Sequence, residues 1–142
     1  MAEITRRFEF DYGHRVLGHE GKCKHLHGHR GVAEVTVSSP ELDDLGRVLD
    51  FSVVKELVGK WIDENWDHNF LGHPDDPLFE DVAAVFGYKA PYMMPNGNPT
   101  AENMVAVLFD VADSILSPMG LKVVSCRFYE TPNCRADHYA SK

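Results

Sequence analysis

Three histidines lie close together in the sequence and could hold a metal ion. His27 and His29 flank Gly28, and His14 lies upstream. All three share the two-residue parity of the apolar positions in two predicted strands, so their imidazoles should point toward one buried side. Three neutral imidazoles with one open coordination position are typical of catalytic zinc. A buried histidine is also commonly a hydrogen-bonded core residue, and the spacing alone leaves both interpretations open.

A cysteine precedes this pair of histidines by four positions. Cys23 lies between Lys22 and Lys24, and neighbouring positive charge favours the thiolate form. This environment suits a nucleophile or a general base. The alternative role, that of a small buried hydrophobic side chain, fits Cys126 better because Cys126 lies within an alternating apolar pattern. Three cysteines are an odd and sparse set, which indicates reduced thiols rather than a disulfide framework.

Two acidic positions are also candidates for chemistry. Asp67 precedes His68, but adjacent residues of a regular helix or strand do not face each other, so this pair would need a turn to meet. The alternative is an ordinary turn after a helix. Glu130 ends an apolar strand on its buried parity, and burial of a carboxylate is costly unless it binds something. A heterocycle with a guanidine-like edge would satisfy it.

Composition restricts the class of protein. The chain has 142 residues, of which 44% are hydrophobic and 25% are charged, as expected for one globular domain over residues 1–142. Its net charge of -8 disfavours general attraction to nucleic acid or to anionic membranes. The N-terminal residues lack the apolar segment of a signal peptide, and no apolar run approaches the ~18 residues of a membrane span. We therefore expect a cytoplasmic protein.

Periodicity predicts the elements that position these residues. Alternating apolar residues predict strands at 4–12, 33–37, 124–129 and 135–139. Apolar residues at helical spacing predict a helix capped by Ser52 and a second helix capped by Thr100, the latter ending before Pro118. Residues 72–99 contain several prolines and glycines and predict a long irregular connection with a short helix at 78–86.

The order of these elements predicts an α+β fold. Two strands, two helices and two strands (ββααββ) favour an antiparallel four-stranded sheet with both helices on one face. Such a sheet has open edges. These edges are either shielded or paired between identical copies that close into a ring.

Six ordered motifs resemble those of the family of 6-pyruvoyltetrahydropterin synthase and 6-carboxytetrahydropterin synthase. They span nearly the whole chain: Phe10–Arg15, Cys23-x-x-x-His27-Gly28-His29, Leu49–Phe51, Asp67–His68, Pro99–Asn103 and Tyr129–Thr131. The resemblance implies a tunnelling fold whose subunits form a β-barrel ring and stack as a homohexamer. It places the pterin sites at subunit interfaces, where Glu130 could act with the zinc of a neighbouring chain.

The resemblance also implies roles for individual residues. His14, His27 and His29 would bind zinc, which ligates and acidifies the side-chain hydroxyls of 7,8-dihydroneopterin triphosphate. Glu130 would anchor the pterin ring through two hydrogen bonds, and Thr100, Glu102 and Thr131 would help to frame the pocket. Cys23 resembles the general base, with Asp67 and His68 as the pair that relays protons.

The gap between Cys23 and His27 bears on the product. Its three residues resemble the 6-carboxytetrahydropterin synthase branch of queuosine and other deazapurine pathways, which releases acetaldehyde and triphosphate. Cysteine at this position also argues against membership of the branch whose proteins use glutamate there and form a folate precursor. The alternatives are the pyruvoyl-forming activity and a zinc-containing pterin-binding protein without turnover.

Two features depart from the resemblance. The connection between His68 and Pro99 is longer than in compact relatives, and it carries aromatic and methionine residues that either reshape the pocket or pack at an interface: Tyr88, Tyr92, Met93 and Met94. His25 is an additional histidine. It could bind phosphate together with Lys24 and Arg30, or it could be an ordinary surface residue.

Overall fold

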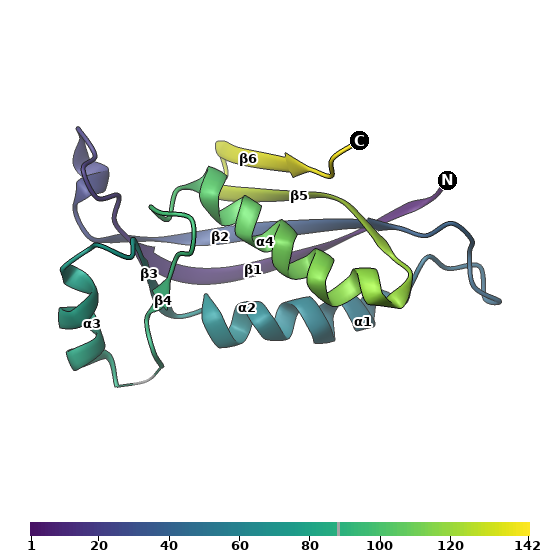
Figure 1. Ribbon diagram of the computed structural model, residues 1–142, viewed down its shortest axis with the longest axis horizontal. Helices are drawn as coiled ribbons and strands as arrows, with labels where there is room; N and C mark the ends of the chain where they lie inside the picture. The colour runs from purple at the N-terminus through teal and green to yellow at the C-terminus, as the bar shows by residue number, and fades with distance from the viewer. Residues whose placement is uncertain (88) are drawn as a thin grey trace.

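The computed structural model describes residues 1–87 and 89–142, which form a six-stranded sheet with helices on one face (Figure 1). The strands are β1 (Glu3–His14), β2 (His27–Ser38), β3 (Asn69–Gly72), β4 (Tyr92–Met93), β5 (Lys122–Thr131) and β6 (Cys134–Tyr139). The α-helices are α1 (Phe51–Val54), α2 (Lys60–Asn65), α3 (Leu78–Phe86) and α4 (Ala101–Leu116). A π-helical segment, η2 (Lys55–Gly59), joins α1 to α2, and the 3-10 turns are η1 (Lys22–Lys24) and η3 (Ser117–Met119).

The sheet corrects the predicted four-stranded antiparallel arrangement. Its order is β4-β3-β1-β2-β5-β6, with antiparallel pairs from β1 to β6 through β2 and β5. β3 pairs in parallel with both β1 and β4. β3 has four residues and β4 has two, so neither is long enough to show a clear alternation in the sequence. In the described part of the chain the sheet is open, with β4 and β6 at its edges.

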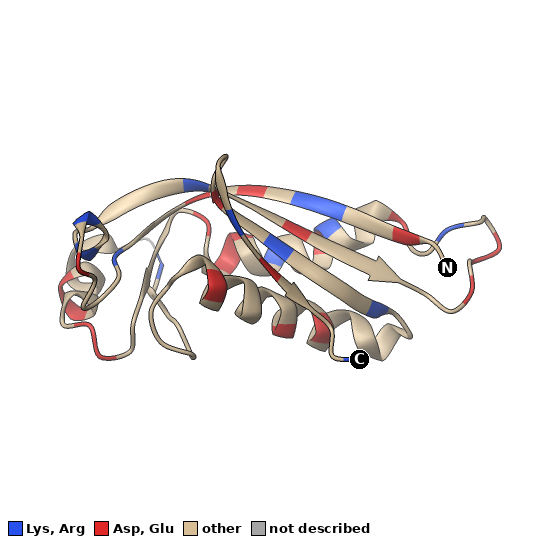
Figure 2. Ribbon diagram, turned by 90° about the horizontal axis from the view of Figure 1, so that it is seen from above, with Lys and Arg blue, Asp and Glu red and all other residues tan. Residues whose placement is uncertain are grey.

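The core lies between the sheet and the helices α1 to α2 and α4 (Figures 1 and 2). Val35 and Val37 of β2 and Phe128 of β5 are fully buried, together with Met104 and Leu108 of α4. The opposite face of the sheet carries charged side chains that pair across strands, such as Arg30 with Asp11 and Arg127 with Asp137. Among the described residues, no helix is both long and apolar enough to cross a membrane.

The helix caps support one prediction and correct another. Thr100 caps α4 as predicted, because its hydroxyl accepts a hydrogen bond from the backbone N–H of Asn103 at 3.1 Å. The first helix is instead capped by Asp50, whose carboxylate accepts from the Ser52 N–H at 2.9 Å. Ser52 itself lies inside the first turn. Both residue types cap well, so the sequence alone did not separate them.

Two β-bulges in β5 change which side chains face the core. In the pairing of β2 with β5, Thr36 lies opposite Ser125 and Val37 opposite Val123, which leaves Val124 as the extra residue. Val123 and Cys126 are therefore buried, whereas Val124, predicted to face the core, is only half-buried. The second bulge is at Glu130, between Tyr129, which pairs with Arg135, and Thr131, which pairs with Cys134. A bulge adds a residue to one strand and turns its side chain out of the regular alternation.

The long connection between β3 and α4 contains structure of its own. The helix predicted at 78–86 is confirmed as α3. Met94 is fully buried, and Tyr92 packs edge-on against Trp61 and Trp66, whereas Met93 is half exposed. Tyr92 and Met94 therefore pack in the subunit's own core, while Tyr88 lies outside the described residues.

Candidate metal centre and catalytic residues

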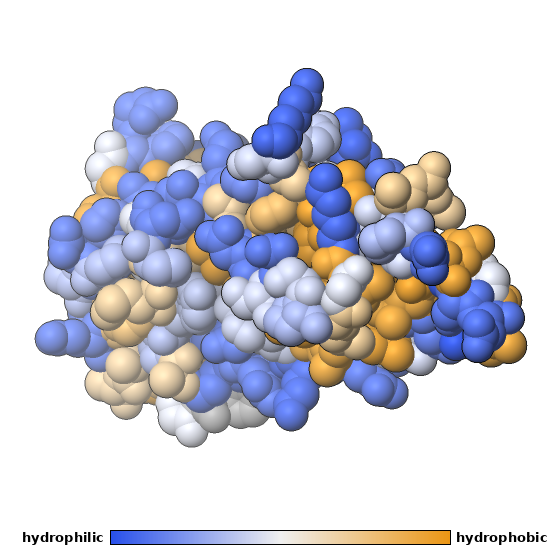
Figure 3. All heavy atoms as spheres, turned by 45° about the vertical axis from the view of Figure 1, so that its right-hand side comes forward, coloured by the Kyte–Doolittle hydropathy of each residue, from blue (hydrophilic) through white to orange (hydrophobic). Residues whose placement is uncertain are grey.

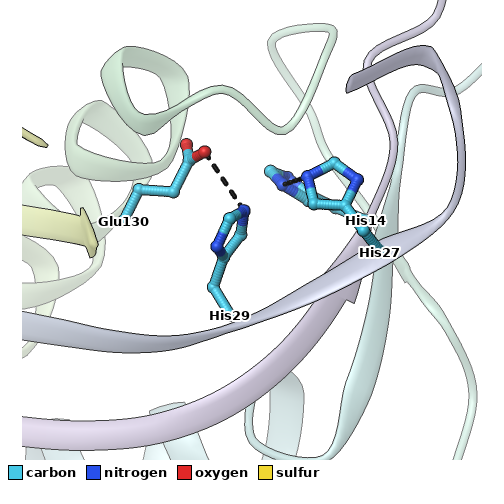
Figure 4. A group of neighbouring side chains, drawn as sticks. All are labelled: His14, His27, His29 and Glu130. Atoms are coloured by element: carbon cyan, nitrogen blue, oxygen red, sulfur yellow. Dashed lines mark hydrogen bonds and ion pairs between the residues drawn. The ribbon is translucent and has the colours of Figure 1, made fainter. Parts of the chain in front are cut away.

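Three histidines meet where β1 ends and β2 begins. The antiparallel register places His14 opposite His27, and Tyr12 opposite His29. Alternation along the two strands then directs all three imidazoles to the same side of the sheet, as predicted (Figure 4). The Nε2 atoms of His14 and His27 lie 3.1 Å apart. At Gly28, a Cβ atom would lie 3.1 Å from the carbonyl oxygen of Tyr12, so the close approach of β1 and β2 favours glycine there.

Two backbone carbonyls orient the rings. The Nδ1 atom of His14 lies 2.7 Å from the carbonyl oxygen of Pro99, and the Nδ1 atom of His27 lies 2.7 Å from that of His25. A carbonyl oxygen only accepts hydrogen bonds, so each Nδ1 carries the proton and donates it. In the neutral ring Nε2 then keeps a free lone pair, and both of these atoms point into the cluster.

Burial favours the neutral form of His14 and His29. It lowers the pKa of His14 to about 4, an effect to which His27 and His29 add, although the bond to Pro99 opposes it. Burial also lowers the pKa of His29, with Glu130 opposing and His27 assisting. A neutral imidazole is the form that binds a metal ion.

Glu130 joins the three histidines in one group of possible ligands. Its Oε1 atom lies 3.2 Å from Nε2 of His29, and one donor atom from each of the four side chains lies within 4.8 Å of the others (Figure 4). The Nε2 atom of His29 is buried and makes no well-directed hydrogen bond with any described residue. An unsatisfied buried nitrogen among three imidazoles and a carboxylate fits a metal ion, which would supply its missing partner.

The sequence neighbours Asp67 and His68 also meet. The Nδ1 atom of His68 lies 3.0 Å from Oδ1 of Asp67. They face each other because His68 has a left-handed backbone, with φ of 53°, which supplies the turn that the sequence required. Two hydrogen bonds with the backbone of Asp11 hold this turn. The N–H of His68 donates to the carbonyl oxygen of Asp11 at 2.6 Å, and the N–H of Asp11 donates to Oδ1 of Asp67 at 3.1 Å.

The other predicted residues are spread around this centre. Cys23 lies in η1 as a half-buried free thiol, and its sulfur makes no hydrogen bond with a described residue. Thr131 lines a hollow of about 630 Å³ together with His29 and Glu130. The hydroxyl of Thr100 is used in the cap of α4, and Glu102 is exposed in the first turn of that helix. The structure therefore joins Glu130 to the histidines of its own chain, whereas Cys23 makes no hydrogen bond or ion pair with Asp67 or His68 within the described part of the chain.

Sequence reasoning missed the groups that support the site. The carbonyls of Pro99 and His25 have no signature in the sequence, because every residue has a carbonyl. The imidazole of His25 is exposed, so its backbone rather than its ring supports the cluster. Immediately after His14, the Arg15 guanidinium donates two hydrogen bonds to the buried carboxylate of Asp76, which ties the end of β1 to the connection before α3.

Comparisons with known proteins agree with the motifs. The model of the family 6-pyruvoyl tetrahydropterin synthase matches residues 3–141. A protein of Rickettsia conorii called 6-carboxy-5,6,7,8-tetrahydropterin synthase is 43% identical over 136 residues, which cover 94% of this chain and 97% of that protein. A protein of the same name from Aquifex aeolicus is 32% identical, with 96% of each chain covered.

A solved structure shows the same arrangement of elements. An uncharacterized protein from Wolinella succinogenes superposes with a TM-score of 0.83 at 30% identity, covering 99% of this chain and 98% of the other. The match of the family model to nearly the whole chain, together with relatives above 30% identity over nearly their full length, shows that the chain belongs to the 6-pyruvoyl tetrahydropterin synthase family.

Proposed function

We propose that the protein is a zinc-dependent lyase that converts 7,8-dihydroneopterin triphosphate to 6-carboxy-5,6,7,8-tetrahydropterin, acetaldehyde and triphosphate. The observation that carries this proposal is the convergence of three histidines, each with a nitrogen available to a metal, beside the Glu130 carboxylate. The names of the relatives from Rickettsia conorii and Aquifex aeolicus support the carboxy product. The three-residue gap between Cys23 and His27 supports the same branch.

Each part of the site has a distinct task in this reaction. Zinc, held by His14, His27 and His29, would supply a Lewis acid that acidifies the hydroxyls of the substrate side chain. Glu130, with Thr131 beside it in the same hollow, would hold the pterin ring by its amino and N–H edge. Fixing the ring in this way sets the position of the side chain relative to the acid and base groups.

Proton transfer is assigned to three further residues. Cys23, a half-buried free thiol, would take a proton from the substrate side chain. Asp67 orients His68 through Nδ1, which leaves Nε2 of the exposed imidazole available for proton relay. Thr100, which caps the start of α4, would help to frame the substrate pocket. Glu102 in the same turn is exposed and available to substrate or to another chain.

We also propose that six copies assemble into stacked barrel rings. Tyr12–His14 of β1 pair with β3 and Asp11 bonds to the turn before it, so residues 3–10 of β1 leave one edge unpaired within the described part of the chain, and β6 provides another at the far side. Leu42, Leu45 and Phe51 are exposed apolar side chains. Figure 3 shows apolar surface on the side of the molecule that it brings forward. Free strand edges and exposed apolar surface favour association. Sedimentation equilibrium should give six times the 16.0 kDa chain mass, and a monomer would refute the assembly.

Product analysis tests the function. Purified protein loaded with zinc is incubated with 7,8-dihydroneopterin triphosphate, and the products are identified by mass. A carboxytetrahydropterin with acetaldehyde is the expected result. A pyruvoyl product would assign the sister activity instead, and unchanged substrate at full zinc occupancy would favour a pterin-binding protein without turnover.

A further inference from the structure

The carboxylate of Glu130 has no cationic partner in the described part of the chain. Its one ionic neighbour there is the imidazole of His29, whose Nε2 atom lies 3.2 Å from Oε1 of Glu130. The Glu130 side chain is 24% exposed, and that of His29 is 17% exposed. A partly buried carboxylate beside a buried nitrogen that lacks a hydrogen bond indicates that both atoms serve a common partner with positive charge.

The distances fit a metal ion as that partner. Zinc–nitrogen and zinc–oxygen bonds of about 2.0–2.2 Å in a tetrahedron place neighbouring donor atoms roughly 3.3 Å apart. His14 and His27 present two nitrogens 3.1 Å apart, and His29 and Glu130 present a nitrogen and an oxygen 3.2 Å apart. The remaining separations within the group are no larger than 4.8 Å, a gap that small side-chain rotations would close.

The backbone explains why Glu130 can reach this position. It occupies the bulge in β5, where the pairing with β6 passes from Tyr129 to Thr131 and leaves Glu130 without an opposite residue. Its side chain points from the end of β5 toward His29, as Figure 4 shows. A bulge next to a functional site commonly directs a side chain in this way.

We propose that Glu130 is the fourth ligand of the metal in the substrate-free protein and that the pterin displaces it. This inference rests on the proposed function, in which the same carboxylate holds the pterin ring. A carboxylate engaged by the ring's amino and N–H edge would be drawn away from a metal held by the histidines, so binding of the ring would leave a coordination position for the substrate hydroxyls. Arrival of the substrate would thus open the site to its own side chain.

The first test measures metal binding without substrate. Zinc affinity is determined by competition with a chelator for the parent, Glu130→Gln and Glu130→Asp, with Glu34→Gln as the control. Glu34 lies on β2, faces the opposite side of the sheet and is 4.0 Å from Arg127, so its substitution makes the same change of charge away from the cluster. Glu130→Asp keeps the charge but shortens the side chain, which separates ligation from a general electrostatic effect.

Glu130→Gln and Glu130→Asp should both bind zinc at least tenfold more weakly than the parent, whereas Glu34→Gln should match it. With cobalt in place of zinc, the visible spectrum of Glu130→Gln should differ from that of the parent. Circular dichroism of the metal-free variants checks that each is folded. Parent-like zinc affinity and cobalt spectrum in a folded Glu130→Gln protein would overturn the assignment of Glu130 as a ligand.

The second test follows displacement. Addition of 7,8-dihydroneopterin triphosphate to the cobalt-substituted parent should change its spectrum as the carboxylate leaves. An unchanged spectrum at saturating substrate would overturn the exchange. Failure of the proposed function is recognised separately, because it appears as absence of product from the zinc-loaded parent, while the affinity measurement needs no substrate at all.

Discussion

At the scale of single residues, the site is defined by which atom of each side chain is free. The backbone carbonyls of Pro99 and His25 occupy Nδ1 of His14 and His27 and leave their Nε2 atoms for a metal. Cys23 and Cys126 differ in how far their thiols are buried. Burial raises the pKa of Cys126 to about 12, which makes that thiol inert, whereas Cys23 is half-buried in a turn between lysines.

Replacement of Cys23 tests its role as the base. Cys23→Ala should lower kcat by about 10²–10⁴-fold, the range that general-base catalysis contributes. Zinc content should be unchanged, because Cys23 is not part of the histidine cluster. Steady-state kinetics together with metal analysis make the comparison, and Cys134→Ala, which removes an exposed thiol in β6, is the matched control. A fully active Cys23→Ala protein would show that another group is the base.

At the scale of secondary-structure elements, the long connection supports the site. Lys89 donates hydrogen bonds to the carbonyl oxygens of Asp63 at 2.6 Å and Asp67 at 2.7 Å, so it satisfies the end of α2 and the turn that leads to His68. Asn69 adds bonds to the carbonyls of Asn65 and Ala90. These contacts hold the left-handed backbone of His68, a conformation that persists only where its surroundings enforce it.

Loss of the Lys89 ammonium should therefore misplace His68. We expect Lys89→Met to lower kcat roughly tenfold with a smaller effect on KM, because the proton relay rather than pterin binding is disturbed. Lys60→Met is the control, since Lys60 is an exposed lysine whose partner Glu64 lies 3.8 Å away on the surface of α2. Equal kcat values for the two variants would assign Lys89 a purely structural role.

The link between β1 and α3 depends on a buried ion pair. Arg15→Met leaves the Asp76 carboxylate buried without its guanidinium, which should reduce the free energy of unfolding by about 3 kcal/mol at pH 7. The lower end of the range for buried pairs applies because the Arg15 side chain is 24% exposed. Urea denaturation measures the change, with Arg47→Met in an exposed pair as the control.

The same pair predicts a dependence on pH. Hydrogen bonds from Arg15 hold the pKa of Asp76 below its ordinary value. The pair's contribution is thus complete above the unfolded pKa of about 3.9 and is lost as the pH falls through the lower folded value. The difference in stability between parent and Arg15→Met should shrink over that acid range. A difference that stays constant down to the lowest pH would contradict this origin.

At the scale of the whole molecule, the candidate metal cluster of His14, His27, His29 and Glu130 lies at one end of the sheet, outside the main hydrophobic core. Trp66, Phe128 and Leu108 are completely buried in that core, which supplies stability without a metal ion. The cluster connects β1 to β2 where a twelve-residue register already joins them. We therefore expect a metal ion at this cluster to serve chemistry and not to hold the fold together.

Chelation tests this separation. Removal of the metal should abolish turnover, keep the far-ultraviolet circular dichroism of the loaded protein and allow full recovery when zinc is restored. Thermal melts of both forms measure the stability. A protein that loses its secondary structure on chelation would instead have a structural metal, as small zinc domains do.

The sequence by itself determined what depends on local periodicity. Alternation in two strands placed His14, His27 and His29 on one side, and polar residues at helix starts predicted the cap at Thr100, because a strand or a cap is specified within a few neighbouring positions. The grouping of the three histidines could be predicted from the sequence for the same reason, since they lie on two adjacent strands.

Only the tertiary structure decided the rest. The short strands β3 and β4 exist because β1 and each other supply their hydrogen bonds, and their own sequences are too short to specify them. The carbonyl that orients His14 comes from Pro99, 85 positions away, and the left-handed turn at His68 depends on contacts with Asp11. Glu130 faces the histidines because a bulge breaks the pairing of β5 with β6. The pairing of β3 and β4, the carbonyl of Pro99 and the bulge at Glu130 are all made by backbone groups, so their partners are selected by the folded chain and not by residue type.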